Sequence, residues 1–229
     1  MGFDFVEILF QMIAFLFAIS IHESAHAWTA SRCGDQTARM LGRVTLNPIK
    51  HIDPIGTVVL PVIAAISHIP LLGWAKPTPV DPRNFKNPVM DDILTSVAGP
   101  VSNFIVATGA LFILGGIALT SLTGRSAVVG MISGQSGSAD STLFPLSKLL
   151  FELMLVNIWL AVFNLIPVPP LDGSHVIRHF MSESVRRAYD SVGIFGLMAL
   201  VFLGGNLLSA VTRPFILFYV TMLVKILNA

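Results

Sequence analysis

Long apolar segments dominate this chain and limit the folds that it can adopt. Hydrophobic residues make up 54% of its 229 residues and charged residues only 12%, far from the usual balance of a soluble globular domain. Each long segment has enough apolar residues to cross a bilayer, or nearly cross it, as a helix. The segments lie near 5–30, 93–119, 146–166, 191–209 and 211–227. The sequence therefore predicts an all-α polytopic membrane protein.

A sixth apolar stretch, 54–72, favours a different path. Three prolines interrupt it, which suits a broken or re-entrant element better than a straight crossing. Both of its flanks are basic, and basic loops face the cytoplasm: Arg32, Arg39, Arg43 and Lys50 precede it, and Lys76, Arg83 and Lys86 follow it. We therefore expect about five or six transmembrane helices, with a small re-entrant or strand-like element between the first and second long helices.

The positive-inside rule also orients the rest of the chain. It predicts the N-terminus outside, 31–90 inside, 120–143 outside, and both 172–190 and the C-terminus inside. The loops are only tens of residues long, so we expect residues 1–229 to form a single membrane-embedded domain. No Lys or Arg lies within 1–7, which predicts that the first helix is retained rather than cleaved. A net charge of +1 gives no reason to expect nucleic acid as a partner; the lipid bilayer and other membrane segments fit better.

Three ionisable residues, His22, Glu23 and His26, interrupt the first apolar segment in the string HESAH. Residues four apart share one face of a helix, so the two histidines can bind one metal ion while Glu23 reaches a water on that metal. Ionisable groups are costly inside a bilayer, which favours a functional role for all three. A third protein ligand is needed to complete such a site.

The segment 164–173, NLIPVPPLDG, contains the best candidate for that third ligand. Its three prolines break the preceding helix and direct Asp172 into the protein. A carboxylate oxygen is a normal third zinc ligand and leaves a fourth position for water. Taken alone, the segment is equally typical of a Pro-rich turn capped by Asp-Gly. Its combination with the histidine motif favours the metal site.

These strings resemble the site-2 protease family of intramembrane zinc metalloproteases, in its compact prokaryotic form without a PDZ or CBS domain. HESAH matches the H-E-x-x-H of that family, and LDG at 171–173 matches its second signature. The strings AGPVSN at 98–103, GRVTLNPIKHIDPIG at 42–56 and GWAKPTPV at 73–80 are also similar. The resemblance covers a core of residues 5–185 and leaves out the two C-terminal helices expected within 191–227.

The resemblance implies a zinc endopeptidase that cleaves transmembrane protein or peptide substrates near the cytoplasmic face, as a multi-pass protein of a prokaryotic cell membrane. It assigns six residues: His22, His26 and Asp172 as ligands of one zinc ion per chain, Glu23 as catalytic base, and Asn103 and Asn164 as catalytic-site residues that stabilise an oxyanion or hold the substrate. The strand-like residues 40–47 could pair with an unwound substrate, or form a plain connecting loop.

Two other functions remain open from the sequence. A membrane metal transporter could use the same three ligands as a transit site, and it would not need Glu23. A non-catalytic relative could bind substrates without cutting them, although the intact Glu23 and all three ligand residues favour a working protease.

Overall fold

The computed structural model describes residues 5–66, 73–134 and 142–228, and within these residues the regular elements are helices. The α-helices are α1 (Phe5–Cys33), α2 (Thr37–Met40), α3 (Leu60–Ile66), α4 (Pro88–Thr120), α5 (Leu122–Ile132), α6 (Leu143–Asn164), α7 (Asp172–Ile177), α8 (Glu183–Leu203) and α9 (Gly205–Leu227). Shorter helical turns are η1 (Pro48–Lys50), η2 (Pro54–Val59), η3 (Pro82–Asn84) and η4 (Arg178–Phe180). The expected all-α fold is confirmed.

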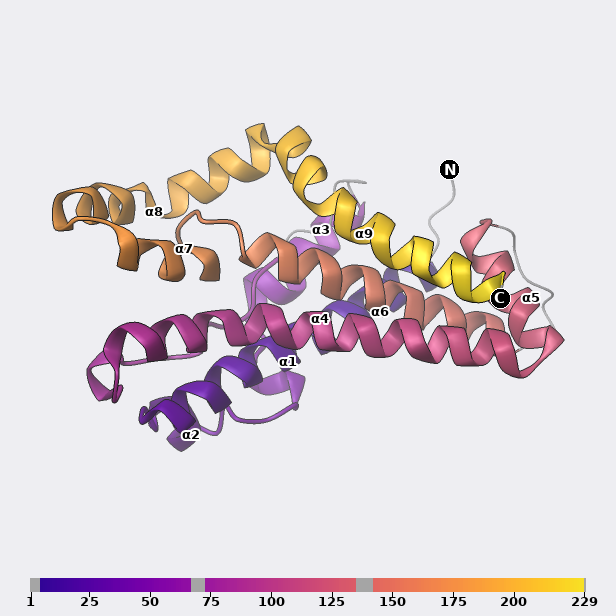
Figure 1. Ribbon diagram of the computed structural model, residues 1–229, viewed down its shortest axis with the longest axis horizontal. Coiled ribbons are helices and arrows are strands. Elements are labelled where there is room, and N and C mark those ends of the chain that lie inside the picture. Colours follow the sequence, from indigo (N-terminus) through magenta and orange to yellow (C-terminus); the bar gives the residue numbers. More distant parts are fainter. Residues whose placement is uncertain (1–4, 67–72, 135–141, 229) are drawn as a thin grey trace.

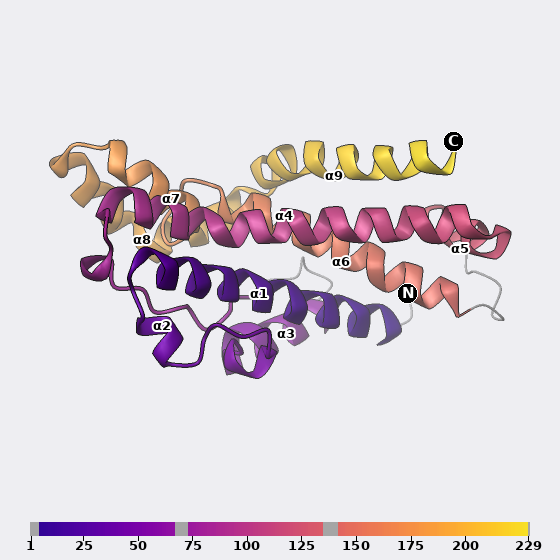
Figure 2. The same ribbon diagram turned by 60° about the horizontal axis from the view of Figure 1, so that its bottom comes forward.

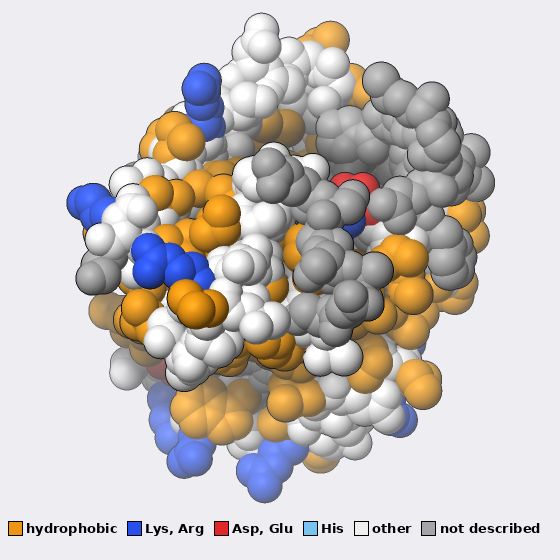
Figure 3. All heavy atoms as spheres, turned by 90° about the vertical axis from the view of Figure 1, so that its right-hand side faces the viewer, with side chains coloured by type: hydrophobic (Ala, Val, Ile, Leu, Met, Phe, Trp, Pro, Cys, Tyr) orange, Lys and Arg blue, Asp and Glu red, His pale blue; other side chains and the backbone are white. Residues whose placement is uncertain are grey.

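Helices α1, α4 and α6 form the body of the molecule, and α9 lies against α4 and α6 (Figure 1). Their core is apolar and closely packed, with Leu114, Met154, Ile158 and Leu223 fully buried. Many other large hydrophobic side chains are exposed on the outside of the molecule, as in the end-on view of Figure 3. Such a surface suits lipid rather than water. The four helices are long and apolar enough to cross a membrane, which makes this a multi-pass architecture.

The apolar segment expected at 191–209 is divided between two helices. Gly204 separates α8 from α9, and α8 bends at Gly193, whose φ of 46° is in the left-handed region. Only the part of α8 after this bend is continuously apolar, and it spans about 15 Å, about half the hydrocarbon core. The described residues contain four helices that are long and apolar enough to cross a membrane, together with shorter apolar helices.

The C-terminus lies at the same end of the bundle as the start of α1 (Figure 1, Figure 2). At this end Arg125 of α5 donates to the carbonyl of Leu227, and Gly115 of α4 faces Ile226. The start of α1 and the end of α9 thus lie together, whereas the sequence analysis expected the termini on opposite sides; the bend within α8 and the break at Gly204 account for this difference.

The two sides of the stretch 54–72 meet, which agrees with the re-entrant element expected from the sequence. The stretch begins with η2 and α3, and residues 67–72 lie outside the described part of the chain. On the return, the N–H of Trp74 donates to the carbonyl of Gly56 at 3.1 Å, and the hydroxyl of Thr57 donates to the carbonyl of Trp74 at 2.7 Å. The two flanks of the stretch are thus side by side.

The connection between α1 and α4 begins and ends at one end of the bundle, because the N–H of Lys86 donates to the carbonyl of Cys33 at 3.2 Å. Within its described residues no β-strand is present, and 41–47 run through turns and bends after α2. The carbonyl of Thr45 is bonded by side chains of Ser24 and His51 rather than by a neighbouring strand. The strand-like element expected here lacks a partner strand in the described residues.

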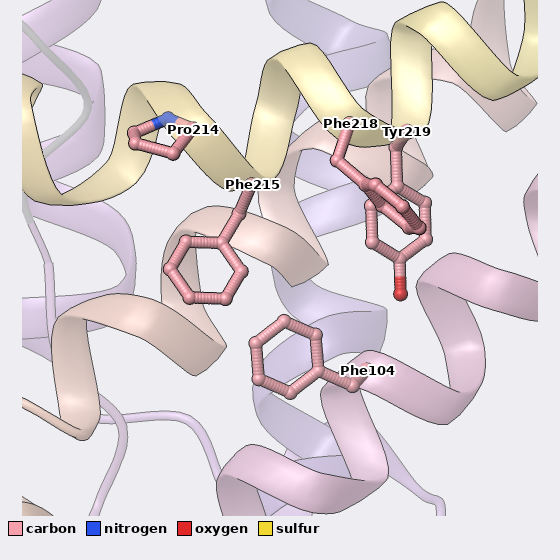
Figure 4. Close-up of a pocket in the computed structure, with 5 residues that line it drawn as sticks. All are labelled: Phe104, Pro214, Phe215, Phe218 and Tyr219. Carbon is pink, nitrogen blue, oxygen red and sulfur yellow. The ribbon is translucent and has the colours of Figure 1, made fainter.

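Helix α9 packs closely on α4 in its C-terminal half. There Tyr219 is buried and its hydroxyl lies 2.8 Å from that of Thr108. Closer to Pro214 the two helices leave an apolar groove (Figure 4), whose lining is Phe104, Pro214, Phe215, Phe218 and Tyr219. The groove is lined by aromatic and proline side chains and by none of the residues expected to bind the metal, so it is not the candidate active site.

This topology predicts the labelling pattern of single cysteines in a Cys33→Ser background. Thr45→Cys and Asn84→Cys should react with a membrane-impermeant maleimide from one side, because the connection that carries them starts and ends at one end of the bundle. Asn228→Cys should react from the opposite side, beside the start of α1. Labelling of positions 45 and 84 from different sides would contradict the re-entrant path.

Candidate active site

His22 and His26 occupy successive turns of α1 and turn their imidazoles towards one point. Their Nε2 atoms are 3.0 Å apart, and both residues are buried. Asp172, the first residue of α7, brings its Oδ2 to 3.1 Å from Nε2 of His22 and 3.4 Å from Nε2 of His26. The structure therefore brings together the three residues that the sequence analysis selected as ligands.

The geometry of this cluster fits a zinc ion. Ligand atoms at the usual zinc–nitrogen distance of about 2.0–2.1 Å and a tetrahedral angle are separated by about 3.3 Å, and the observed separations are 3.0–3.4 Å. The Oδ2 atom of Asp172 is buried and has no hydrogen-bond partner, which is the state of a ligand atom reserved for a metal. Three protein ligands leave a fourth tetrahedral position for water or substrate.

The hydrogen bonds behind the two imidazoles fix their tautomers. Nδ1 of His26 lies 2.7 Å from the carbonyl of Thr95, which can only accept, so Nδ1 carries the proton. Nδ1 of His22 lies 2.6 Å from Oδ1 of Asn103 and donates to it. In both rings the lone pair is then on Nε2, which faces the cluster. This is the usual arrangement of metal-binding histidines.

Asn103 lies behind His22, on the side away from the cluster. It is fully buried on α4, and its amide nitrogen donates to Oδ1 of Asn157 at 2.7 Å and to the carbonyl of Ala18 at 3.3 Å. These two bonds set the direction of the amide, so its oxygen faces His22. Asn157 of α6, a residue that the sequence analysis did not select, supports Asn103 across the helix interface by accepting this hydrogen bond.

Asn164 is the last residue of α6 and is partly buried. Its amide nitrogen donates to the carbonyl of Leu160 in the same helix, at 2.9 Å. One N–H bond of this amide remains available for another acceptor. Unlike Asn103, Asn164 has no hydrogen bond to either histidine among the described contacts.

Glu23 is held by the loop that follows the re-entrant stretch. The N–H of Thr78 donates to Oε2 of Glu23 at 2.8 Å, and the hydroxyl of Thr78 donates to the backbone carbonyl of Glu23 at 3.1 Å. The sequence analysis did not select Thr78, because a backbone N–H leaves no signal in a sequence. One carboxylate oxygen of Glu23 is thereby fixed.

Arg43 stabilises the backbone of the same loop. Its guanidinium is buried and donates to the carbonyls of Lys76 and Pro77, which directly precede Thr78, and to the carbonyl of Lys50. A buried guanidinium with three carbonyl acceptors satisfies backbone groups that cannot form helical hydrogen bonds. The sequence analysis treated Arg43 only as a topological charge, and its role in the loop depends on the tertiary structure.

Asp35 anchors the far end of this loop. Its buried carboxylate accepts from Thr37, from the N–H of Asp81 and from the side chain of Asn84. Burial by itself raises the pKa of Asp35, but these hydrogen bonds outweigh it and hold the pKa below its usual value. The carboxylate therefore stays charged at neutral pH and keeps the loop attached to the end of α1.

Two glycines allow the elements of the site to approach closely. A Cβ on Gly99 of α4 would lie 2.5 Å from Nε2 of His26 and 2.7 Å from Nε2 of His22. A Cβ on Gly173 would lie 2.3 Å from the carbonyl oxygen of Leu165, at the end of α6. Both distances are too short for any side chain, so α4 closes over the imidazoles and α7 rests on α6 only because these positions are glycine.

Comparison with known proteins agrees with this centre. The family model "Peptidase family M50" matches residues 10–204. YwhC of Bacillus subtilis, which is named as a zinc metalloprotease, is 34% identical over 194 residues, covering 85% of this chain and 79% of YwhC. Rip2 of Mycolicibacterium smegmatis, also named as a zinc metalloprotease, is 28% identical over 202 residues, covering 87% of this chain and 68% of Rip2.

A more distant relative covers part of the chain. The regulator of sigma-E protease RseP of Salmonella typhimurium is 29% identical over 158 residues, which is 63% of this chain and 33% of RseP. No solved structure matches the chain significantly.

Two buried histidines of a candidate membrane-spanning helix and the partly buried Asp172 of α7 form a cluster that could hold a metal ion, and the class that this fold and site indicate is an intramembrane metalloprotease. The chain belongs to peptidase family M50, the site-2 protease family, and its cofactor is zinc. Membership of a zinc metalloprotease family sets aside the membrane metal transporter that the sequence had left open.

The close approach of Gly99 to the two imidazoles predicts how the addition of one methyl group at this position changes zinc binding. Gly99→Ala should lower the zinc content of the purified protein strongly, because the added Cβ occupies the space in front of both Nε2 atoms. Gly109→Ala is the matched control, since it changes the same helix where nothing lies within 4 Å of the new atom. Equal zinc contents in the two variants, measured by metal analysis at matched protein, would show that Gly99 does not face the ligands.

Proposed function

We propose that His22, His26 and Asp172 hold the catalytic zinc and that Glu23 is the general base of an endopeptidase that cuts membrane-spanning substrates. The observation that supports this most directly is that the three ligand atoms lie within 4.8 Å of one another. Glu23 directly follows one of the ligands, His22, in α1. The proposal adds residue roles and a substrate class to the family membership.

In this mechanism the zinc ion, when bound, lowers the pKa of a water towards neutrality and polarises the substrate carbonyl. Glu23 takes the proton of the attacking water as the new carbon–oxygen bond forms, and then gives a proton to the leaving amine as the carbon–nitrogen bond breaks. The N–H of Thr78 holds one oxygen of Glu23, which leaves the other oxygen to exchange the proton.

The two asparagines would act differently. Both N–H bonds of the Asn103 amide are used by Asn157 and Ala18, so Asn103 fits a positioning residue that fixes the tautomer of His22. Asn164 has a remaining N–H and fits better as a donor to the oxyanion or to the substrate backbone. This assignment refines the expectation that both residues act directly on the substrate.

The depth of the centre supports cleavage near the cytoplasmic face. Trp28 is half exposed, and the Arg32 guanidinium lies 5.2 Å from the centre of its ring, a combination typical of a membrane interface. His26 lies about 3 Å along the helix from Trp28, on the bilayer side. By the positive-inside rule this end of α1 faces the cytoplasm, and we place the protein in the cell membrane as a multi-pass protease.

A transmembrane substrate must be unwound before its carbonyls can be attacked. Residues 43–47 lie beside the active-site helix, where the hydroxyl of Ser24 bonds the carbonyl of Thr45, while Val44 and Leu46 are exposed. This segment has no partner strand in the described part of the chain, and we propose that it receives an extended substrate by strand addition. The whole of residues 1–229 would act as one membrane-embedded unit.

The role of Glu23 predicts a separation of metal binding from cleavage. Glu23→Gln should keep zinc and lower the cleavage rate by about 100- to 10,000-fold, because the amide fills the same space but cannot accept the proton. Asp172→Ala should lose zinc as well as activity. Cleavage of a single-span reporter and metal analysis measure the two effects, and turnover of Glu23→Gln within tenfold of the unchanged protein would point to another base.

The need to unwind the substrate predicts which substrates are cut well. Replacing Gly, Pro or Asn near a mapped cut site by Ala or Leu should slow cleavage, since unwinding costs roughly 1 kcal/mol more for Ala than for Gly. The amount of each uncleaved substrate variant in cells that carry the Glu23→Gln enzyme serves as the control for substrate expression. Unchanged cleavage across such a series would show that substrate selection depends on docking rather than unwinding.

A further inference from the structure

A buried carboxylate, that of Asp92 in α4, lies against the end of α7. Its side chain is only 6% exposed and meets three basic side chains. Nε2 of His179 is 2.7 Å and Nη2 of Arg178 is 3.2 Å from Oδ2, and Nδ1 of His175 is 3.5 Å from Oδ1. One acidic group in a membrane-spanning helix thus contacts both α7 and η4.

These basic residues follow Asp172 by one to two helical turns. Helix α7 has six residues, too few to be stable by itself, and it follows a proline-rich segment. Its first turn is located by the close approach of Gly173 to the carbonyl of Leu165. Its other end is connected to the bundle through the hydrogen bonds and ion pairs of Asp92. The position of Asp172 therefore depends on both ends.

We propose that Asp92 is a positioning residue for the metal centre, which fixes α7 on α4 so that Asp172 stays within reach of His22 and His26. This rests on the proposed zinc ligand set. Charge-assisted hydrogen bonds to a buried carboxylate are stronger than neutral ones, so this contact can hold a short helix that its own hydrogen bonds cannot. Without it, zinc binding has to order α7, and this ordering weakens the affinity.

A second metal site at Asp92 is a poorer explanation of the same cluster. Arg178 shares Oδ2 with His179, and a guanidinium stays protonated and repels a cation. Among the described residues, the group whose ligand atoms converge as a metal site is His22, His26 and Asp172. The side chains around Asp92 are arranged as donors to a carboxylate.

The test measures zinc affinity and ligand geometry in the full-length protein. Zinc dissociation constants are obtained by competition with a chelating indicator, and the visible spectrum of the Co²⁺-substituted protein reports the ligands around the metal. Asp92→Ala should weaken zinc binding by about 10- to 100-fold and change the Co²⁺ spectrum towards that of Asp172→Ala. Asp92→Asn should recover part of the affinity, because its amide oxygen still accepts from His179.

Asp35→Asn is the matched control. It alters an equally buried carboxylate that also fastens a loop, but one that contacts neither α7 nor the ligands. It should lower the thermal stability and leave the zinc dissociation constant within about threefold of the unchanged protein. A merely structural role of Asp92 would give the same pattern as Asp35→Asn and would overturn the proposal.

Two further outcomes separate the proposal from the ligand assignment. Unchanged zinc affinity in Asp172→Ala would refute the ligand set itself, whereas loss of zinc in Asp172→Ala with unchanged affinity in Asp92→Ala would refute only the role of Asp92. If Asp92→Ala does not fold, His179→Ala decides, because it removes the shortest contact to Asp92 from a partly exposed position. Its zinc affinity should fall, and an unchanged value would overturn the proposal.

Discussion

The structure depends on one physical constraint, that polar groups placed inside a bilayer must find partners within the protein. His22 and His26 lie in a mostly apolar helix, where an unpaired imidazole nitrogen is costly. Each ring uses one nitrogen for a hydrogen bond, to Asn103 or to the carbonyl of Thr95, and directs the other to the cluster with Asp172. The proposed zinc binding and the membrane environment thus favour the same orientation of both side chains.

This constraint determines how the helices pack. Asn103 joins α1, α4 and α6 through His22, Ala18 and Asn157, in a fully buried line of hydrogen bonds. Such a line is possible only where the helices approach closely, and the missing side chain of Gly99 allows α4 to lie directly on the two imidazoles. The buried hydrogen bonds of Asn103 specify the register of the three helices, and the absence of a side chain at Gly99 allows α4 to approach closely enough for these bonds to form.

The same need for hydrogen-bond partners applies to the non-helical segments at the end of the bundle. Backbone that leaves a helix within or near the membrane needs hydrogen-bond partners of its own. Buried charged side chains supply them here: Arg43 binds three carbonyls of the connection between α1 and α4, and Asp35 accepts from the loop that carries Thr78. In this way charges that are distant from the metal place the N–H that orients Glu23.

The sequence by itself determined the class of fold, and its local patterns selected the three residues that the structure brings together in a cluster that could hold a metal. These patterns are apolar length, proline content, basic flanks and the four-residue spacing of His22 and His26. It could not show how α7 is fixed, or that Asn103 faces a histidine rather than the substrate, because both depend on contacts between residues far apart in the chain. It also did not show that the end of α9 lies beside the start of α1 (Figure 1), since hydropathy does not reveal the bend at Gly193 and the break at Gly204. Those features were decided only by the tertiary structure, where backbone geometry and long-range hydrogen bonds outweigh local composition.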